Sequence, residues 1–248
     1  MENLAPSADF FAPLILHIET GTAVCSVALS HGERLVALRE NTEGMQHAKL
    51  LAVFIEEILH EQQISISSLD AVSVSEGPGS YTGLRVGVST AKGLCYGAHK
   101  PLIAVSSLQS LAMLAIARQL LPAPEARIIP MIDARRMEVY TAQFSPIGEQ
   151  LSATEAKIID SSSFAEILEQ QPVLFIGDGA EKCKAVITHP QAHFVPLQTS
   201  AFGMILPALK AFAQQQFVDT AYFEPFYLKD FVAIPSKKQL LCNNTAGQ

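Results

Sequence analysis

The chain has 248 residues, of which 49% are hydrophobic and 17% are charged, so it contains enough apolar material for a folded core. Its length fits one large domain or two domains of about 100 to 120 residues each. The formal net charge is −7. Because such a chain repels phosphate, we do not expect it to bind nucleic acid by itself.

The cysteine pattern predicts free thiols in a reducing compartment. The four cysteines form no CxxC pair and no dense framework. No apolar run reaches the length of about 18 to 20 residues that a membrane span needs. Residues 1–13 lack the basic start and apolar core of a signal peptide, and we interpret them as a short mobile extension. The protein is therefore expected in the cytoplasm, without membrane contact.

The first half of the sequence predicts a three-stranded meander and then alternating helices and strands. Apolar or alternating runs predict strands at residues 14–18, 23–30 and 33–39, with a tight turn at His31 and Gly32. Apolar residues three and four apart predict a helix over residues 46–62. The later elements are a strand at 70–75, a helix to about 98, a strand at 102–105 and a helix to about 121, which Ser106 and Ser107 can cap.

This order of elements is typical of an actin-like half-domain. The second half shows another meander with fewer helices, which indicates a degenerate copy. The predicted fold is α/β, of the actin-like ATPase (ASKHA, ribonuclease-H-like) class, with a mixed sheet in each of two domains. We place the domains at residues 14–121 and 122–248, the second being smaller and ending in an irregular tail.

A glycine-rich loop at residues 77–83 follows a predicted strand and begins a helix. It lacks the Gly-Lys-Ser/Thr ending of a Walker loop, and Thr82 stands where the dinucleotide fingerprint needs glycine. Free amides at a helix start can still bind an anion. Two interpretations stay open: nucleotide contact through Gly77, Gly79 and Ser80, or a structural tight turn.

A second candidate turn, Glu19-Thr20-Gly21-Thr22, lies between the first two strands. In actin-like ATPases this turn carries an aspartate that holds the metal and phosphate, whereas Glu19 reaches about one bond further. The turn at residues 177–180 resembles its counterpart in the second domain. These turns are either vestiges of a nucleotide site or ordinary strand ends.

The sequence offers no convincing catalytic or metal-binding constellation. His189 and His193 have helical ligand spacing, but Pro190 argues against a helix between them. Neither a GxSxG nor an HExxH motif occurs. We therefore expect no catalytic residue and no metal ligand in this chain.

Five segments together resemble the TsaB (YeaZ-like) family, which is related to TsaD and the glycoprotease-like proteins. They are ILHIETGTAVCSVAL at 15–29, GPGSYTGLRVG at 77–87, VSSL at 105–108, MIDARRMEVY at 131–140 and EPFYL at 224–228. The resemblance implies an accessory subunit in the synthesis of threonylcarbamoyladenosine (t6A) in tRNA. Its partners would be a TsaD-type catalytic subunit and a TsaE-type ATPase, with tRNA contacted only through the complex.

In this family TsaD transfers the threonylcarbamoyl group to adenosine 37 of tRNAs that read codons beginning with A (ANN codons). Its metal-binding HxxxH lies early in its third helix, and residues 107–115 here contain no histidine. The resemblance thus implies a non-catalytic scaffold that activates TsaD and requires no cofactor, with weak ATP or ADP binding, or a nucleotide at the TsaD interface, left open. The alternative is an independent actin-fold ATPase or phosphotransferase that uses Glu19 and the glycine loop.

Family members pair through the first two helices of the N-terminal domain, with TsaD or as homodimers. Here the first helix has surplus apolar residues, and the second carries small residues every four positions. The stripe on the second helix either meets a partner or packs on the protein's own sheet. The residues expected at the interface are Leu50, Val53, Phe54, Gly83, Gly87 and Ala91.

Overall fold

The computed structural model describes residues 12–44 and 46–228. Most of the expected mobile extension, Cys242 and the end of the irregular tail lie outside this part of the chain. No helix in the described residues is long and apolar enough to cross a membrane.

The first sheet has five strands in the order β3-β2-β1-β4-β5. β1 pairs antiparallel with β2 and parallel with β4, so the expected mixed sheet is confirmed. The turn between β2 and β3 is at Gly32 and Glu33, one residue later than predicted, because the left-handed φ of +58° falls on Gly32. The strands are β1 (Leu14–Glu19), β2 (Cys25–His31), β3 (Arg34–Asn41), β4 (Ala71–Gly77) and β5 (Leu102–Ser106).

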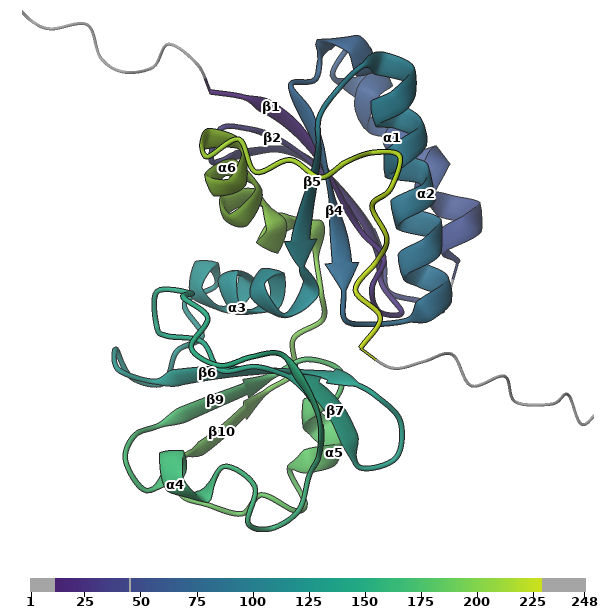
Figure 1. The fold of residues 1–248 in the computed structure, drawn as a ribbon. Coiled ribbons are helices and arrows are strands. Elements are labelled where there is room, and N and C mark those ends of the chain that lie inside the picture. The colour runs from purple at the N-terminus through teal and green to yellow at the C-terminus, as the bar shows by residue number, and fades with distance from the viewer. Residues whose placement is uncertain (1–11, 45, 229–248) are drawn as a thin grey trace, which may run out of the picture.

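Helices cover both faces of this sheet (Figure 1). The predicted helices α1 (His47–Glu61) and α2 (Tyr81–Ala98) are confirmed, and they enclose one core against β1, β2 and β4. The short 3-10 helix η1 (Ile66–Ser68) lies between α1 and β4. The other face of the sheet packs against α6 (Ile205–Ala213) and the 3-10 helix η2 (Ala201–Met204).

The second sheet repeats the topology of the first. Its order, β8-β7-β6-β9-β10, is again a meander with two parallel strands beside its first strand. The repeat bears out the predicted two-domain actin-like fold. The elements are β6 (Arg127–Asp133), β7 (Glu138–Thr141), β8 (Glu155–Ile158), β9 (Val173–Ile176) and β10 (Ala192–Val195), with the short helices α4 (Ala165–Leu168) and α5 (Ala180–Cys183).

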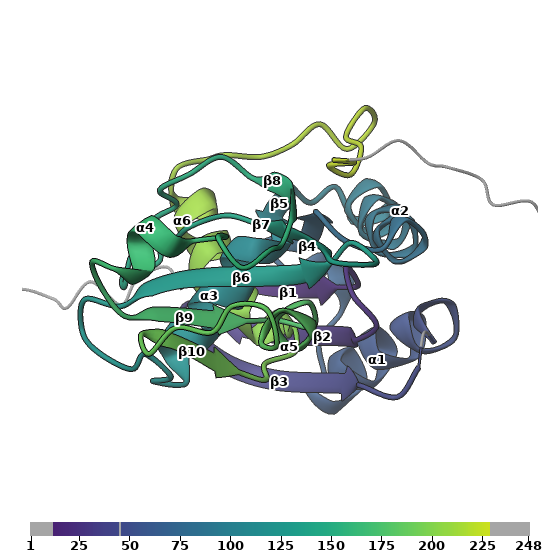
Figure 2. The same cartoon turned by 90° about the horizontal axis from the view of Figure 1, so that it is seen from below.

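Helix α3 (Ser107–Ala117) lies between the two sheets (Figures 1 and 2). Ser106 caps it, as expected, by accepting a hydrogen bond from the Gln109 amide at 3.4 Å. Its residues Leu108, Leu111 and Leu114 are fully buried in a core that β6 and β9 complete. The helix follows β5 of the first sheet but covers the second, so the two halves share a core layer.

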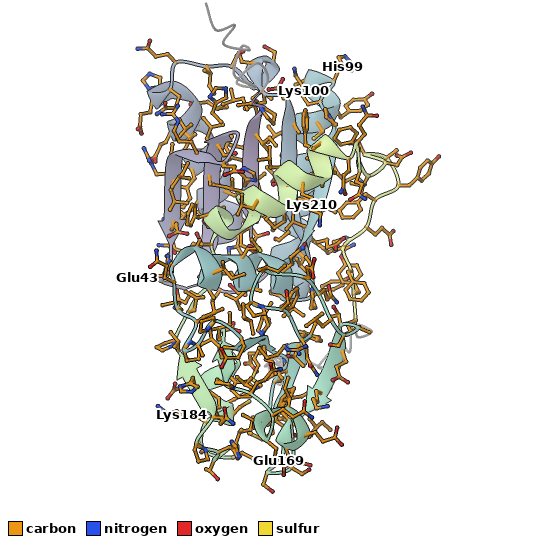
Figure 3. All side chains as sticks on the ribbon, turned by 90° about the vertical axis from the view of Figure 1, so that its left-hand side faces the viewer. Glu43, His99, Lys100, Glu169, Lys184 and Lys210 are labelled. Atoms are coloured by element: carbon orange, nitrogen blue, oxygen red, sulfur yellow. The ribbon has the colours of Figure 1, made fainter. Side chains whose placement is uncertain are left out.

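The chain then returns to the first sheet, although the sequence placed all residues after 121 in the second domain. Figure 3 shows α6, marked by Lys210, lying against the first sheet above α3. Residues 217–228, here named the strap, then pass over β5 and run beside α2, next to β4 (Figure 1). The Lys92 ammonium donates to the carbonyls of Ala221 and Phe223 at 3.0 and 3.1 Å, and the Phe226 amide donates to the Glu76 carbonyl at 2.7 Å.

Replacing Lys92 by methionine should loosen the strap, because two carbonyls lose their charged donor while the aliphatic packing remains. We expect the free energy of unfolding to fall by about 1–2 kcal/mol and proteolysis within residues 217–228 to become faster. Urea unfolding and limited proteolysis measure the two effects. Lys184→Met, at an exposed position of the second domain, is the control. Equal behaviour of both variants would contradict the fastening role.

Candidate functional site

The turn Glu19–Thr22 lies at the end of β1 and is almost completely buried. Glu19 is inaccessible to solvent, and its Oε1 accepts a hydrogen bond from the Gly21 amide at 2.6 Å. Its Oε2 has no hydrogen-bond partner among the described residues, nor has the buried Ser107 hydroxyl, which lies with Glu19 Oε1 at the point where a side chain on Gly21 would begin. Burial raises the pKa of Glu19 to about 7, against the opposing effect of the hydrogen bond from the Gly21 amide.

The glycine loop packs directly on this turn. The Ser80 amide donates to the Gly21 carbonyl at 2.7 Å, and a side chain at Gly79 would collide with that same carbonyl. Gly77 has a φ of +109°, which favours glycine. These contacts give the loop a structural role, whereas the predicted nucleotide contact of Gly77, Gly79 and Ser80 stays a prediction.

The small residues of α2 face the same turn. The Thr20 hydroxyl donates to the Gly83 carbonyl at 2.9 Å, and added methyl groups at Gly83 and Gly87 would strike Thr20. Ala91 continues the row into the first core. The stripe therefore packs on the protein's own sheet, the second of the two interpretations. A partner that used these three residues would have to displace the turn.

Thr22 connects the turn to two further elements. Its carbonyl accepts a hydrogen bond from the buried His47 ring at 2.8 Å, which holds the start of α1. Its hydroxyl lies 2.7 Å from that of Thr199, in the segment that leaves the second sheet. Sequence reasoning missed His47 and Thr199, because neither belongs to a recognisable local motif.

The space between the domains at this turn is small. A cavity of about 30 Å³ lies between Thr22 and Val24 on one side and Leu111, Ile132 and Asp178 on the other. It can hold about one water molecule, whereas pockets for small ligands usually measure about 300–1,000 Å³. A nucleotide at this place would require the two domains to separate.

The turn at residues 177–180 corresponds to the glycine loop and not, as the sequence suggested, to the turn after β1. It follows β9, which occupies the place of β4 in the repeated topology. Gly177 has a φ of +108°, close to that of Gly77, and the Gly179 amide donates to the Met131 carbonyl at 2.9 Å. Burial raises the pKa of Asp178, which accepts a hydrogen bond from the Asp133 amide.

Within residues 12–44 and 46–228, no group of three or more histidine, cysteine, aspartate or glutamate side chains is arranged to hold a metal ion. His193 lies on β10, and His189 precedes that strand, where its Nδ1 accepts a hydrogen bond from the Gln191 amide.

The outer surfaces of α1 and α2 contain a different set of small and apolar residues. Leu50 and Phe54 are half-buried against the first core, and Val53 is 43% exposed. On α2 a second stripe spaced by four residues faces solvent, and two of its members, Gly93 and Gly97, have no neighbouring atoms where a side chain would be added. The stripe consists of Ser89, Gly93 and Gly97.

Comparisons with known proteins show the family of this chain. A family model described as TsaD, tRNA N6-adenosine threonylcarbamoyltransferase, matches residues 42–246. The tRNA threonylcarbamoyladenosine biosynthesis protein TsaB of Escherichia coli is 29% identical over 90% of this chain and 99% of its own. TsaB of Bacillus subtilis is 30% identical over 70% of this chain and 74% of its own. The chain belongs to the TsaB (YeaZ-like) family.

A solved structure supports the same conclusion. YeaZ from Pseudomonas aeruginosa is 27% identical and superposes with a TM-score of 0.72, covering 87% of this chain and 100% of its own. The family resemblance expected from the five sequence segments is thus confirmed.

The two stripes of α2 predict opposite effects of the same substitution. Gly87→Ala should destabilise the protein by about 1–3 kcal/mol, because the new methyl group meets Thr20 at a packed contact. Gly93→Ala should stabilise it by up to about 1 kcal/mol, because alanine favours the helix and the site is open. Urea unfolding of the two variants checks both signs, and destabilisation by Gly93→Ala would contradict an open position.

Glu19 should make stability depend on pH. Its pKa of about 7 in the folded protein exceeds the ordinary value of 4.5, so the folded state holds this proton more tightly than the unfolded state. Stability is therefore lost as pH rises from about 4.5 to 7, by about 3 kcal/mol in all. We expect Glu19→Gln, which cannot ionise, to gain stability relative to the original protein between pH 5 and pH 8.

The measurement is urea unfolding at a series of pH values, compared with Glu33→Gln at the exposed β2–β3 turn. A constant difference between Glu19→Gln and the original protein at all pH values would show that burial does not raise the Glu19 pKa.

Proposed function

We propose that this chain is a non-catalytic subunit of the t6A system, which activates a TsaD-type transferase acting on adenosine 37 of tRNAs that read ANN codons. Its relatives carry the name of that pathway, and the matching family model is that of the transferase. The observation that carries the non-catalytic role is the occupied turn. The Thr20 hydroxyl and the Gly21 and Thr22 carbonyls are hydrogen-bonded to α1, α2 and the residue that caps α2, where an enzyme of this fold would bind a substrate phosphate.

Helix α3 supports the same role. The transferase of this family holds its metal with two histidines early in its third helix, and α3 here has none. Its first residue is Ser107, and most of the following positions are apolar or small and buried, the half-buried Gln109 being an exception. The helix serves as a core layer between the sheets, so a metal at this place would lack ligands and solvent access.

The outer face of α1 and α2 is the surface that we propose for the transferase-type partner. Ser89, Gly93 and Gly97 would let a partner helix approach closely, since the distance between packed helices depends on the side chains at the contact. Val53 would add apolar area. The same surface could pair two copies of this chain, and we propose that the heteromeric contact is the functional one. A TsaE-type ATPase would join this assembly, and tRNA would be contacted through it.

We propose that the isolated chain requires no nucleotide. The hydrogen bond between Thr22 and Thr199 and the close packing of the glycine loop support this proposal, because a triphosphate would have to break both contacts. A nucleotide bound by the complex would then lie at the contact with the transferase, and weak ATP or ADP binding to the chain alone would require the domains to open.

The test of the proposed role is reconstitution with the cognate transferase, the ATPase, tRNA and threonylcarbamoyl-adenylate, with and without this chain. We expect modified adenosine to depend on the chain, and the chain alone to turn over neither ATP nor threonylcarbamoyl-adenylate. Undiminished modification without it would refute the activator role. ATP turnover by the chain alone, abolished by Glu19→Ala, would instead support an independent ATPase or phosphotransferase.

Gly93→Leu tests the proposed surface, because the added side chain enters open space and should leave the fold intact. We expect the affinity for the transferase to fall at least about ten-fold, as a bulky residue separates closely packed helices. Calorimetry measures the affinity, and Ile158→Leu, at a 72% exposed position of the second domain, is the control. If both variants lose affinity for the transferase equally, or if neither does, the partner binds at another surface.

A further inference from the structure

A cleft of about 620 Å³ lies on the second domain, remote from the turn and helices discussed above. It is bounded by β8, the loop that follows it, α4 and the first residue of β6. Figure 3 places Glu169, the residue after α4, at the end of the molecule farthest from the first domain. The volume is in the range of small-molecule sites.

The cleft exists because the two halves of the repeated fold differ in one helix. After the first meander, α1 has 15 residues and covers its sheet together with α2. After the second meander, α4 has only four residues, and with α5 it encloses a smaller core. The part of the second sheet that a longer helix would cover stays open.

The strands present polar side chains toward this opening. Arg127 alternates with Ile129 and Met131, so it points to the same face as these two core residues. Lys157 pairs with the buried Val139 and shares its face. In the first domain the corresponding face of β1, which helices cover, carries the apolar residues Leu14, Leu16 and Ile18. The polar side chains thus occur in the domain whose sheet lacks a long covering helix.

Arg127 is held in place but is not neutralised. With its amide oxygen toward the guanidinium, Gln171 accepts hydrogen bonds from Arg127 Nε and Nη2 at 3.2 and 3.0 Å, while its nitrogen donates to the Glu125 carbonyl. Within residues 12–44 and 46–228, Arg127 forms no ion pair with a carboxylate. A fixed guanidinium with remaining N–H donors is suited to a carboxylate or phosphate group.

The other charged side chains at the cleft, apart from Glu166, have partners of their own, whereas Arg127 has no carboxylate partner among the described residues. Lys157 lies 5.4 Å from the centre of the Phe164 ring and 3.3 Å from Glu155 Oε1. Asp160 accepts hydrogen bonds from Ser162 and Ser163 within the loop. The remaining acid is Glu166, exposed on α4.

We propose that this cleft binds a small organic anion that carries a carboxylate or phosphate group. Arg127 binds that group, Lys157 and Gln143 contact the polar body of the ligand, and the Phe164 ring provides an apolar wall. Phe164 is suited to this because its ring also packs on Phe175 in the core, at 5.5 Å between ring centres. The site does not depend on the role proposed for the α1–α2 surface.

The test is an NMR titration of the full chain with inorganic phosphate and, separately, with succinate, both at constant ionic strength. We expect saturable shifts confined to the amides of residues 157–171 and of Arg127 with at least one probe. Saturation by phosphate identifies a phosphate site, and saturation by succinate identifies a carboxylate site. Shifts that do not saturate with either probe, or that spread over the surface, would overturn the proposal.

Variants decide whether the cleft is responsible. Arg127→Met should weaken binding of the anion at least about ten-fold, because it removes the guanidinium group and its N–H donors. Gln171→Leu should weaken it less, because the guanidinium remains but loses its orientation, and this variant answers the question if Arg127→Met does not fold. Arg118→Met, at the exposed end of α3, should bind as the original protein does. Unchanged binding in both cleft variants would refute the site.

Discussion

The close contact between the turn at Thr20–Thr22 and helix α2 is the constraint on which the first domain depends. It requires glycine at positions 79, 83 and 87, because each of them faces the backbone or side chain of the turn. Glycine inside a helix costs up to about 1 kcal/mol relative to alanine. That cost is offset by the hydrogen bonds of Thr20, Gly21 and Thr22, which join β1, α1 and α2 into one unit.

The same contact is the physical basis of the scaffold role that we propose for this fold. A phosphate site at a helix start needs free amides, and a metal bound with the phosphate needs an accessible carboxylate at the turn. Here an amide of the loop binds the Gly21 carbonyl, and burial raises the pKa of Glu19 to about 7, so that a large share of this side chain is neutral near pH 7. The groups that would bind a substrate instead hold α1 and α2 in place, and the outer faces of these helices stay free.

Local patterns predicted much of the fold, because they act over a few residues. Strand alternation located the first strands, and helical spacing located α1 almost to the residue and the end of α2. The order of the meander, helices and strands indicated the actin-like fold class. The stripe at Gly83, Gly87 and Ala91 showed that something approaches α2 closely, but the sequence could not decide what. The partner is Thr20, about 63 residues away, and such a contact depends on tertiary packing. His47, Thr199 and the strap escaped prediction for the same reason.

The two domains have diverged from one topology in complementary ways. The first has long helices over its sheet and a buried turn after β1, so its exposed feature is a helical surface. The corresponding helix of the second domain, α4, has only four residues, and the opening is lined by Arg127, Gln143 and Lys157 together with apolar residues such as Ile158 and Ile167. Loss of cover alone would expose apolar side chains and favour aggregation. Polar residues at these positions keep the opening hydrated, and the orientation of Arg127 by Gln171 goes beyond what solubility requires.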